Sequence, residues 1–130
     1  MTKEKTFAQT VREKYGDTLE EFAFRLCVVP KTVERWESGK KPTTLHKALL
    51  NYADKHDLKL KHDAPEWFVM LTPEKKIEWV CRTVDCTVVE LALKLGVDDN
   101  SIRRWISTNK ISNVGERLIC EFAVHPENFD

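Results

Sequence analysis

The feature that most constrains this chain is an internal repeat, in which a segment of the first half recurs in the second half. When residues 18–43 are aligned with residues 87–112, no gap is needed and nine of the 26 positions are identical. The identical pairs are Thr18/Thr87, Glu21/Glu90, Ala23/Ala92, Leu26/Leu95, Val28/Val97, Arg35/Arg104, Trp36/Trp105, Ser38/Ser107 and Lys41/Lys110. A repeat of this period predicts two copies of one supersecondary unit.

Each copy carries the signals of a capped helix. Thr18-x-x-Glu21 and Thr87-x-x-Glu90 both fit the capping box, in which a hydroxyl and a carboxylate satisfy each other's backbone amides. Apolar residues recur at helical spacing behind each box. Gly96 suits the left-handed position that ends such a helix. Cys27 occupies that position in the first copy, where a positive φ would cost about 1 kcal/mol.

A second, shorter helix is predicted about three residues later in each copy. Pro30 is favourable at the first helical position, and Asp98 is a good N-cap. The residues expected to face inward are Val33, Trp36, Ile102 and Trp105. So short a connection forces the two helices to cross steeply, which is the geometry of a helix-turn-helix.

Further helices flank each pair, so we expect an all-α fold built from two tandem helix-turn-helix units. The predicted boundaries are Gly16 as the end of the first helix, Thr43 or Thr44 as the cap of the fourth, Thr72-Pro73 as the start of the first helix in copy two, and Asn113-x-x-Glu116 as the start of its last. Phe7, Val11 and Tyr15 mark the first of these helices.

The chain is predicted to divide into an amino-terminal domain at residues 1–58, a connecting segment at 59–71 and a carboxy-terminal domain at 72–130. The connecting segment contains Ala64-Pro65 and the apolar run Trp67-Phe68-Val69-Met70-Leu71. A flexible linker would not be so apolar. The segment is therefore interpreted as a wedge that packs one unit on the other, or as a dimer contact.

Composition and charge exclude several classes of protein. With 42% hydrophobic and 32% charged residues, 4 Gly and 5 Pro, the chain is neither fibrous nor disordered. No apolar run approaches the roughly 18 residues of a membrane span, and no secretory signal is visible, so we expect a cytoplasmic protein of a bacterial or phage-infected cell without a membrane partner. The 21 basic and 21 acidic residues give zero net charge, which argues against non-specific coating of nucleic acid.

Neither a metal site nor a catalytic site is predicted. Cys81 and Cys86 are spaced C-x4-C without a second close pair, whereas zinc needs four ligands. The cysteines are expected to be reduced thiols in the core or at its boundary, with redox switching as the alternative. No combination of nucleophile, base and orienting group is visible, so we expect no enzyme and no cofactor.

The segment from Thr18 to Pro42 resembles the helix-turn-helix of the Cro/phage-repressor (XRE) family. The resemblance rests on three features. They are Ala23 in the helix that follows Thr18, the stretch Thr32-Val33-Glu34-Arg35-Trp36-Glu37-Ser38-Gly39, and the following Lys40-Lys41-Pro42. Copy two resembles the family more weakly, because Ile106-Ser107-Thr108 replaces Glu37-Ser38-Gly39. The resemblance implies a lambda-repressor-like helical fold in each half and a transcriptional regulator, usually a homodimer, of phage or mobile-element origin. The glutamine frequent at the start of the family's second helix is replaced here by Leu19 and Val88.

Residues on the outer side of the short helices are candidates for DNA contact. Lys31, Glu34 and Arg35 lie off the inward face, where arginine or lysine can pair with guanine and glutamate with cytosine. Lysines on the following loop suit phosphates. The predicted DNA-binding residues are Thr18, Pro30, Lys31, Thr32, Glu34, Arg35, Ser38, Lys40 and Lys41 in copy one, and Asn100, Ser101, Arg103, Arg104 and Lys110 in copy two. The alternative is that these charges are merely solvated, or that Arg35 and Arg104 pair with Glu37 and nearby acids.

The predicted function is sequence-specific binding of double-stranded DNA by a transcriptional regulator, a repressor acting by promoter occupancy. Copy one is expected to be the principal reader, and copy two to read a second site or to support a homodimer formed through the connecting segment or the carboxy-terminal unit. The alternative is a protein-interaction module on the same scaffold, such as an antitoxin or a mobile-element inhibitor that also regulates its own operon. The acidic second half, with 9 basic and 12 acidic residues in positions 61–130, favours this alternative.

Overall fold

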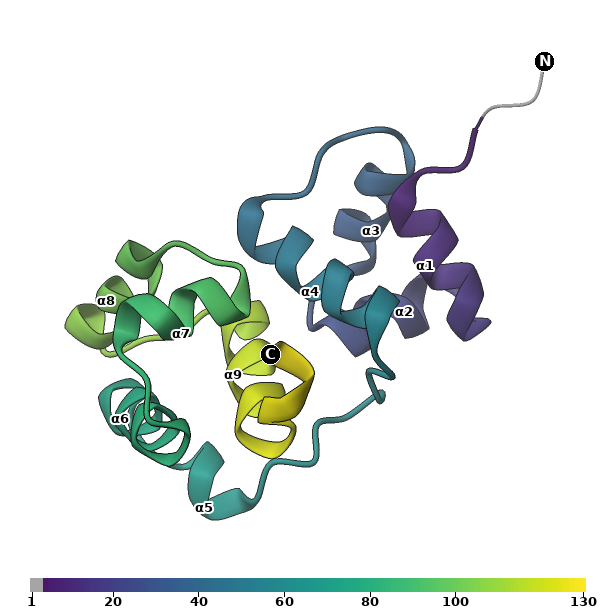
Figure 1. The fold of residues 1–130 in the computed structure, drawn as a ribbon. Coiled ribbons are helices and arrows are strands. Elements are labelled where there is room, and N and C mark those ends of the chain that lie inside the picture. The colour runs from purple at the N-terminus through teal and green to yellow at the C-terminus, as the bar shows by residue number, and fades with distance from the viewer. Residues whose placement is uncertain (1–3) are drawn as a thin grey trace. The chain divides into compact units, whose positions relative to one another are not determined.

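The protein is all-helical. The structure, a computed structural model, describes residues 4–130, and within that range it contains nine α-helices, one short 3-10 helix and no strand (Figure 1). The predicted all-α class is confirmed. The first three residues of the predicted amino-terminal domain lie outside the described part. No helix from residue 4 onward is long and apolar enough to cross a membrane.

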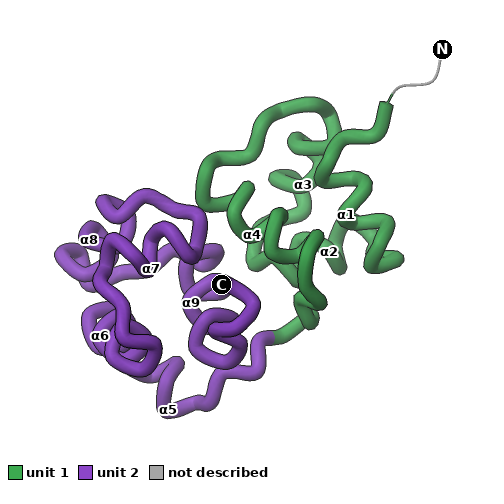
Figure 2. Tube along the Cα trace, in the orientation of Figure 1, with its two compact units in different colours: residues 1–61 green, residues 62–130 purple. Residues whose placement is uncertain are grey.

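The chain divides into two compact units, which we call unit 1 (residues 1–61) and unit 2 (residues 62–130) (Figure 2). The division falls inside the predicted connecting segment, so that residues 59–61 belong to unit 1 and residues 62–71 to unit 2. Unit 1 contains α1 (Phe7–Tyr15), α2 (Leu19–Leu26), α3 (Pro30–Glu37) and α4 (Thr44–Lys55). Unit 2 contains α5 (Glu66–Val69), α6 (Pro73–Val84), α7 (Val88–Leu95), α8 (Asp99–Thr108), α9 (Asn113–Val124) and the 3-10 helix Pro126–Phe129.

The repeat in the sequence is also a repeat of helix boundaries. The shift that aligns Thr18 with Thr87 carries the starts of α2, α3 and α4 onto the starts of α7, α8 and α9, and the end of α1 onto the end of α6. Both capping boxes are present. Thr18 Oγ1 accepts from the Glu21 amide at 3.2 Å while the Glu21 carboxylate accepts from the Thr18 amide at 2.9 Å. The Thr87 and Glu90 pair does the same at 3.1 and 3.0 Å.

The ends of these two helices follow the prediction as well. Cys27 has φ of 60° and Gly96 has φ of 76°, so both residues occupy the left-handed region that closes the helix. Gly16 ends α1 in the same way, with φ of 65°. The cysteine therefore carries a backbone strain that the matching glycine avoids.

A separate apolar core fills each unit. The inward-facing residues predicted on the short helices are all buried, which confirms that face. In unit 1 the core includes Val11, Phe22, Leu26, Val33, Trp36, Leu49, Leu50 and Leu58. In unit 2 it includes Phe68, Ile77, Val80, Leu91, Leu95, Ile102, Trp105, Leu118, Ile119 and Phe122.

The structure shows which residues cap the last helix of each unit. Helix α9 begins at Asn113, as predicted, and its cap is Ser112, whose hydroxyl accepts from the Gly115 amide at 3.2 Å. Of the two threonines proposed to cap α4, Thr43 does so. Phe7 begins α1, the helix it was predicted to mark, and is 45% exposed.

The apolar run of the connecting segment contributes mainly one residue to a core. Phe68 is fully buried, with its ring centroid 5.4 Å from that of Trp79. The ring centroid of Trp67 also lies 5.4 Å from that of Trp79. Trp67 and Met70 nevertheless stay more than half exposed. Residues 67–69 of the run thus lie in α5, and Phe68 anchors that helix in the core of unit 2.

Buried charges form part of both cores. In unit 1, Arg25 makes two hydrogen bonds to Asp17, at 2.8 and 2.9 Å, and donates to the Leu58 carbonyl at 2.6 Å. Its guanidinium also lies 4.3 Å from the centre of the Tyr15 ring. The hydrogen bonds to Asp17 raise the pKa of Arg25 above its ordinary value. One arginine thereby ties the start of α2 to the residues that follow α4.

Candidate nucleic-acid interface

Helix α3 is fixed against unit 1 by its apolar side. Only Cys27, Val28 and Val29 separate it from α2, and the Val28 amide donates back to the Ala23 carbonyl at 2.9 Å. Val33 is fully buried and Trp36 almost so. Because these two residues hold one side of α3 in the core, the opposite side of the helix faces solvent.

The outer side of α3 and the loop after it form a cationic surface, which we call the α3 surface. It consists of Lys31, Glu34, Arg35, Ser38, Lys40 and Lys41, all of them exposed. Among residues 4–130, no ion pair involves any of its four cations. Glu34 is its one carboxylate. The surface therefore presents unneutralised positive charge to an approaching anion.

Glu37, at the end of α3, does not belong to this surface. Its carboxylate accepts two hydrogen bonds from Arg12 of α1, at 2.7 and 2.8 Å, in a partly buried position. The interpretation that Arg35 pairs with Glu37 is therefore wrong. The bond to Glu37 also raises the pKa of Arg12. Arg12 is a positioning residue that the sequence analysis missed, because a partner 25 positions away has no local signal.

Several of the predicted contact residues already have structural roles. The Thr18 hydroxyl caps α2, and Pro30 occupies the first position of α3. The Ser38 hydroxyl donates to the Glu34 carbonyl at 3.0 Å. Thr32 is half-buried. Of the predicted set in unit 1, the residues with the freest side chains are thus Lys31, Glu34, Arg35, Lys40 and Lys41.

The corresponding surface of unit 2 is less cationic. Asn100, Arg103, Arg104 and Lys110 are exposed, and Ser101 is half-buried. The Arg103 guanidinium donates to the Asp99 carboxylate at 3.2 Å, so part of its charge is neutralised. Asp98 caps α8 by accepting from the Asn100 amide at 3.0 Å. We call this set, with its two aspartates, the α8 surface.

The two short helices also end differently. In unit 1, Ser38 follows α3 and Gly39, at φ of 107°, turns the chain toward Lys40. In unit 2, α8 continues to Thr108 and ends at Asn109, at φ of 55°. The last turn of α8 thus takes the place of the glycine turn in unit 1. Two lysines follow that turn in unit 1, whereas only Lys110 follows α8 in unit 2.

Two of the four thiols, those of Cys81 and Cys120, have the character of unreactive groups. Burial and the neighbouring Cys86 raise the pKa of Cys81 to about 12, and burial raises the pKa of Cys120 to about 12. Both thiols are therefore protonated near neutral pH and are poor nucleophiles and metal ligands. Within the described range, no three His, Cys, Asp or Glu side chains are grouped so that they could hold a metal ion.

The geometry thus distinguishes one strongly cationic surface in unit 1 from its weaker counterpart in unit 2. It also shows that the buried sides of α3 and α8 hold both surfaces in place. Comparison of the chain with protein-family models, with curated proteins and with solved structures found no match.

Proposed function

We propose that this protein is a transcriptional regulator that binds double-stranded DNA sequence-specifically through unit 1. The observation that carries the proposal is the α3 surface, whose cations have no ion-pair partner among the described residues. A duplex attracts such a surface because each phosphate carries a negative charge. Occupancy of a promoter by the bound protein would make it a repressor.

In this proposal, α2 and α3 act as a helix-turn-helix with α3 in the major groove. The connection of three residues and the buried Val33 and Trp36 support it, since they present the outer side of α3 as one rigid face. The resemblance of Thr18–Pro42 to the Cro/phage-repressor family points to the same assignment of roles.

The side chains of the α3 surface suit two kinds of contact. Arg35 and Lys31 can donate to guanine O6 and N7, and Glu34 can accept from the amino group of cytosine. Lys40 and Lys41 lie on the loop and suit phosphates, which would fix the position of α3 along the groove. Arg12 contributes indirectly, because its bond to Glu37 holds the last turn of α3.

Unit 2 has a supporting role in the proposal. The pair between Arg103 and Asp99, with Asp98 beside it, weakens the attraction of the α8 surface for phosphate. Arg104 and Lys110 remain available for a weaker contact. We therefore expect unit 1 to supply most of the specificity.

Matched substitutions in the two repeats test the proposal. Arg35 and Arg104 occupy equivalent positions, and both are exposed, so alanine at either should leave the fold intact. Selection of bound sites from random DNA should yield a motif for the wild-type chain, and Arg35→Ala should weaken that binding by about 1–3 kcal/mol and relax one position of the motif. Arg104→Ala should have a smaller effect. Unchanged affinity and motif for a folded Arg35→Ala would refute the assigned orientation of α3, and binding without salt dependence would refute the DNA proposal.

A second candidate role concerns self-association through unit 2. Val89 and Leu93 on α7 are 48% and 77% exposed and lie one turn apart, so they form an apolar strip on the helix. The occupant we propose is a second copy of the chain, because the resemblance to the Cro/phage-repressor family implies a homodimer. Sedimentation of the wild type and of Leu93→Glu tests this: a monomeric wild type at working concentration, or a dimer that survives the substitution, would refute it.

A further inference from the structure

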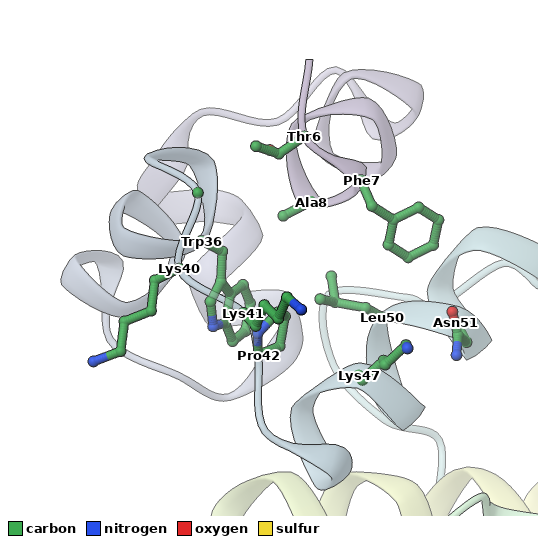
Figure 3. A pocket seen from close by; sticks show the side chains of 11 residues that line it. Thr6, Phe7, Ala8, Trp36, Lys40, Lys41, Pro42, Lys47, Leu50 and Asn51 are labelled. Carbon is green, nitrogen blue, oxygen red and sulfur yellow. The ribbon is translucent and has the colours of Figure 1, made fainter. Parts of the chain in front are cut away.

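Unit 1 contains a pocket beside the α3 surface. It lies between the start of α1, the end of α3 with its following loop, and α4, and its volume is about 480 Å³ (Figure 3). Phe7, Trp36 and Leu50 provide apolar walls, while Lys41, Lys47 and Asn51 provide polar groups. This volume falls within the range typical of pockets for small molecules, as does the combination of apolar walls with a few polar groups.

The charge of the pocket is positive and unbalanced. No Asp or Glu lines it. In Figure 3 the amino groups of Lys41 and Lys47 lie around the space in front of Leu50, whereas Lys40 extends away from it. Within residues 4–130 neither Lys41 nor Lys47 makes an ion pair. An anion would therefore be attracted to the pocket and a cation repelled.

The repeat offers an internal comparison, because unit 2 has an ion pair at the equivalent place. The shift that relates the two copies takes Phe7 to Lys76 and Lys47 to Glu116. In unit 2 these two side chains form an ion pair at 2.7 Å, with the Lys76 side chain only 8% exposed. Unit 2 thus balances the charge at this place with its own residues. Unit 1 cannot balance the charge in this way, because the matching residues are Phe7 and Lys47.

We propose that the pocket of unit 1 binds a small organic anion with an apolar body, such as an aromatic carboxylate. The apolar body would lie among Phe7, Trp36 and Leu50, and the carboxylate would meet Lys41 and Lys47. Lys41 also belongs to the α3 surface. If unit 1 binds DNA as proposed above, an anion in the pocket competes with a phosphate for that lysine and weakens DNA binding.

Direct binding is tested first, without DNA. The full chain, labelled with nitrogen-15, is titrated with 1-naphthoate, with the uncharged 1-naphthamide and with acetate, and the indole N–H signals of its four tryptophans are followed. The expected result is a saturable shift of the Trp36 signal by naphthoate, a weaker one by the amide and none by acetate. Equal binding of naphthoate and naphthamide would overturn the proposal, as would no saturable shift of Trp36.

Two lysines of α4 provide a matched pair of variants. Lys47 lines the pocket, whereas Lys55, on the last turn of the same helix, lies outside it. Lys47→Ala should weaken naphthoate binding by roughly two- to fivefold, the range expected for one exposed charge contact, and Lys47→Glu should weaken it further. Lys55→Ala should leave it unchanged. Equal effects of the Lys47 and Lys55 substitutions would show non-specific attraction and overturn the site.

A DNA experiment then separates the pocket from its proposed regulation. With a selected site, saturating naphthoate should reduce the affinity of the wild type for DNA, and it should reduce that of Lys47→Glu much less. Naphthoate that binds Trp36 without changing DNA affinity would overturn the regulation but support the pocket. A chain that binds no DNA at all would refute the proposed function, while the direct titration would still decide the pocket. A Trp36 signal that shifts with protein concentration alone would show that a second copy fills the pocket, and would overturn a small-molecule site.

Discussion

Replacing Asp17 with alanine should destabilise unit 1 selectively. Asp17 accepts two hydrogen bonds from Arg25, and the two side chains are only 6% and 10% exposed. The substitution leaves the guanidinium buried, with the Leu58 carbonyl and the face of Tyr15 as its remaining contacts. A buried charge that loses its counterion is costly, because neither water nor the opposite charge then compensates for its burial.

The expected loss is large relative to the stability of such a unit. Breaking a buried ion pair by removing one partner costs about 3–5 kcal/mol. We expect a value near the lower limit, about 3 kcal/mol, since Arg25 keeps one strong hydrogen bond to a carbonyl. At about 0.05–0.15 kcal/mol per residue, unit 1, which spans Met1–Lys61, has roughly 3–9 kcal/mol in total. The variant should therefore lose a third or more of the stability of unit 1.

A urea titration followed by nuclear magnetic resonance measures the two units separately. Trp36 belongs to the core of unit 1 and Trp105 to that of unit 2, so their indole N–H signals report on each unit. In Asp17→Ala the midpoint for Trp36 should fall strongly, while that for Trp105 should stay close to the wild-type value.

The double variant Asp17→Ala/Arg25→Met provides the control. It removes both charges and keeps an unbranched apolar side chain at position 25, so it should be more stable than Asp17→Ala alone. A single variant that loses less than about 1 kcal/mol would show that the pair behaves like an exposed one. A double variant as unstable as the single one would show that the loss does not come from the uncompensated arginine.

Three further predictions concern the backbone, the packing and the pH dependence of the units. Cys27→Gly should stabilise unit 1 by about 0.5–1 kcal/mol, because glycine adopts the φ of 60° without strain. Gly96→Ala should destabilise unit 2, because it places a side chain at a φ of 76°. Urea midpoints of the two variants that do not move in opposite directions would contradict this. Gly115→Ala should destabilise unit 2 by about 1–3 kcal/mol, because the added Cβ would lie 2.7 Å from Cζ2 of Trp105 and 2.9 Å from Cγ2 of Ile111. An unchanged melting temperature would contradict this and show that both side chains can move aside. Burial lowers the pKa of His46 below its ordinary value of 6.5, so the unfolded chain binds this proton at a higher pH than the folded chain does. Unit 1 should therefore lose stability as the pH falls through 6.5. His46→Gln should lose less stability over the same range, and an equal fall in urea midpoint for both proteins would refute this origin.

The sequence predicted the helical framework well because its signals are local. Capping boxes act over three residues. The left-handed end at Gly96 follows from the glycine itself, and that at Cys27 from its place in the repeat. The buried faces of α3 and α8 were likewise predicted from helical spacing. The start of α9 at Asn113 was predicted as well, whereas its cap, Ser112, is known only from the hydrogen bond in the folded chain.

The polar contacts between distant residues could not be predicted. Arg12 pairs with Glu37 across 25 positions, and Lys76 with Glu116 across 40. A charged residue on a helix has the same local pattern whether it meets water or a counterion, so no periodicity distinguishes the two. For the same reason the sequence indicated the α3 surface but not the pocket beside it, whose walls come from α1, the loop after α3, and α4.

The coincidence of helix boundaries at a constant shift has a consequence for how such a chain can change over time. The positions that set where helices begin and end are shared by both units, whereas the partly buried ion pairs, such as Arg12 with Glu37 and Lys76 with Glu116, are not. A duplicated framework lets one copy keep an established task while mutations explore the surface of its twin. If unit 1 makes the proposed DNA contact, substitutions among the exposed residues of α8 leave that contact in place.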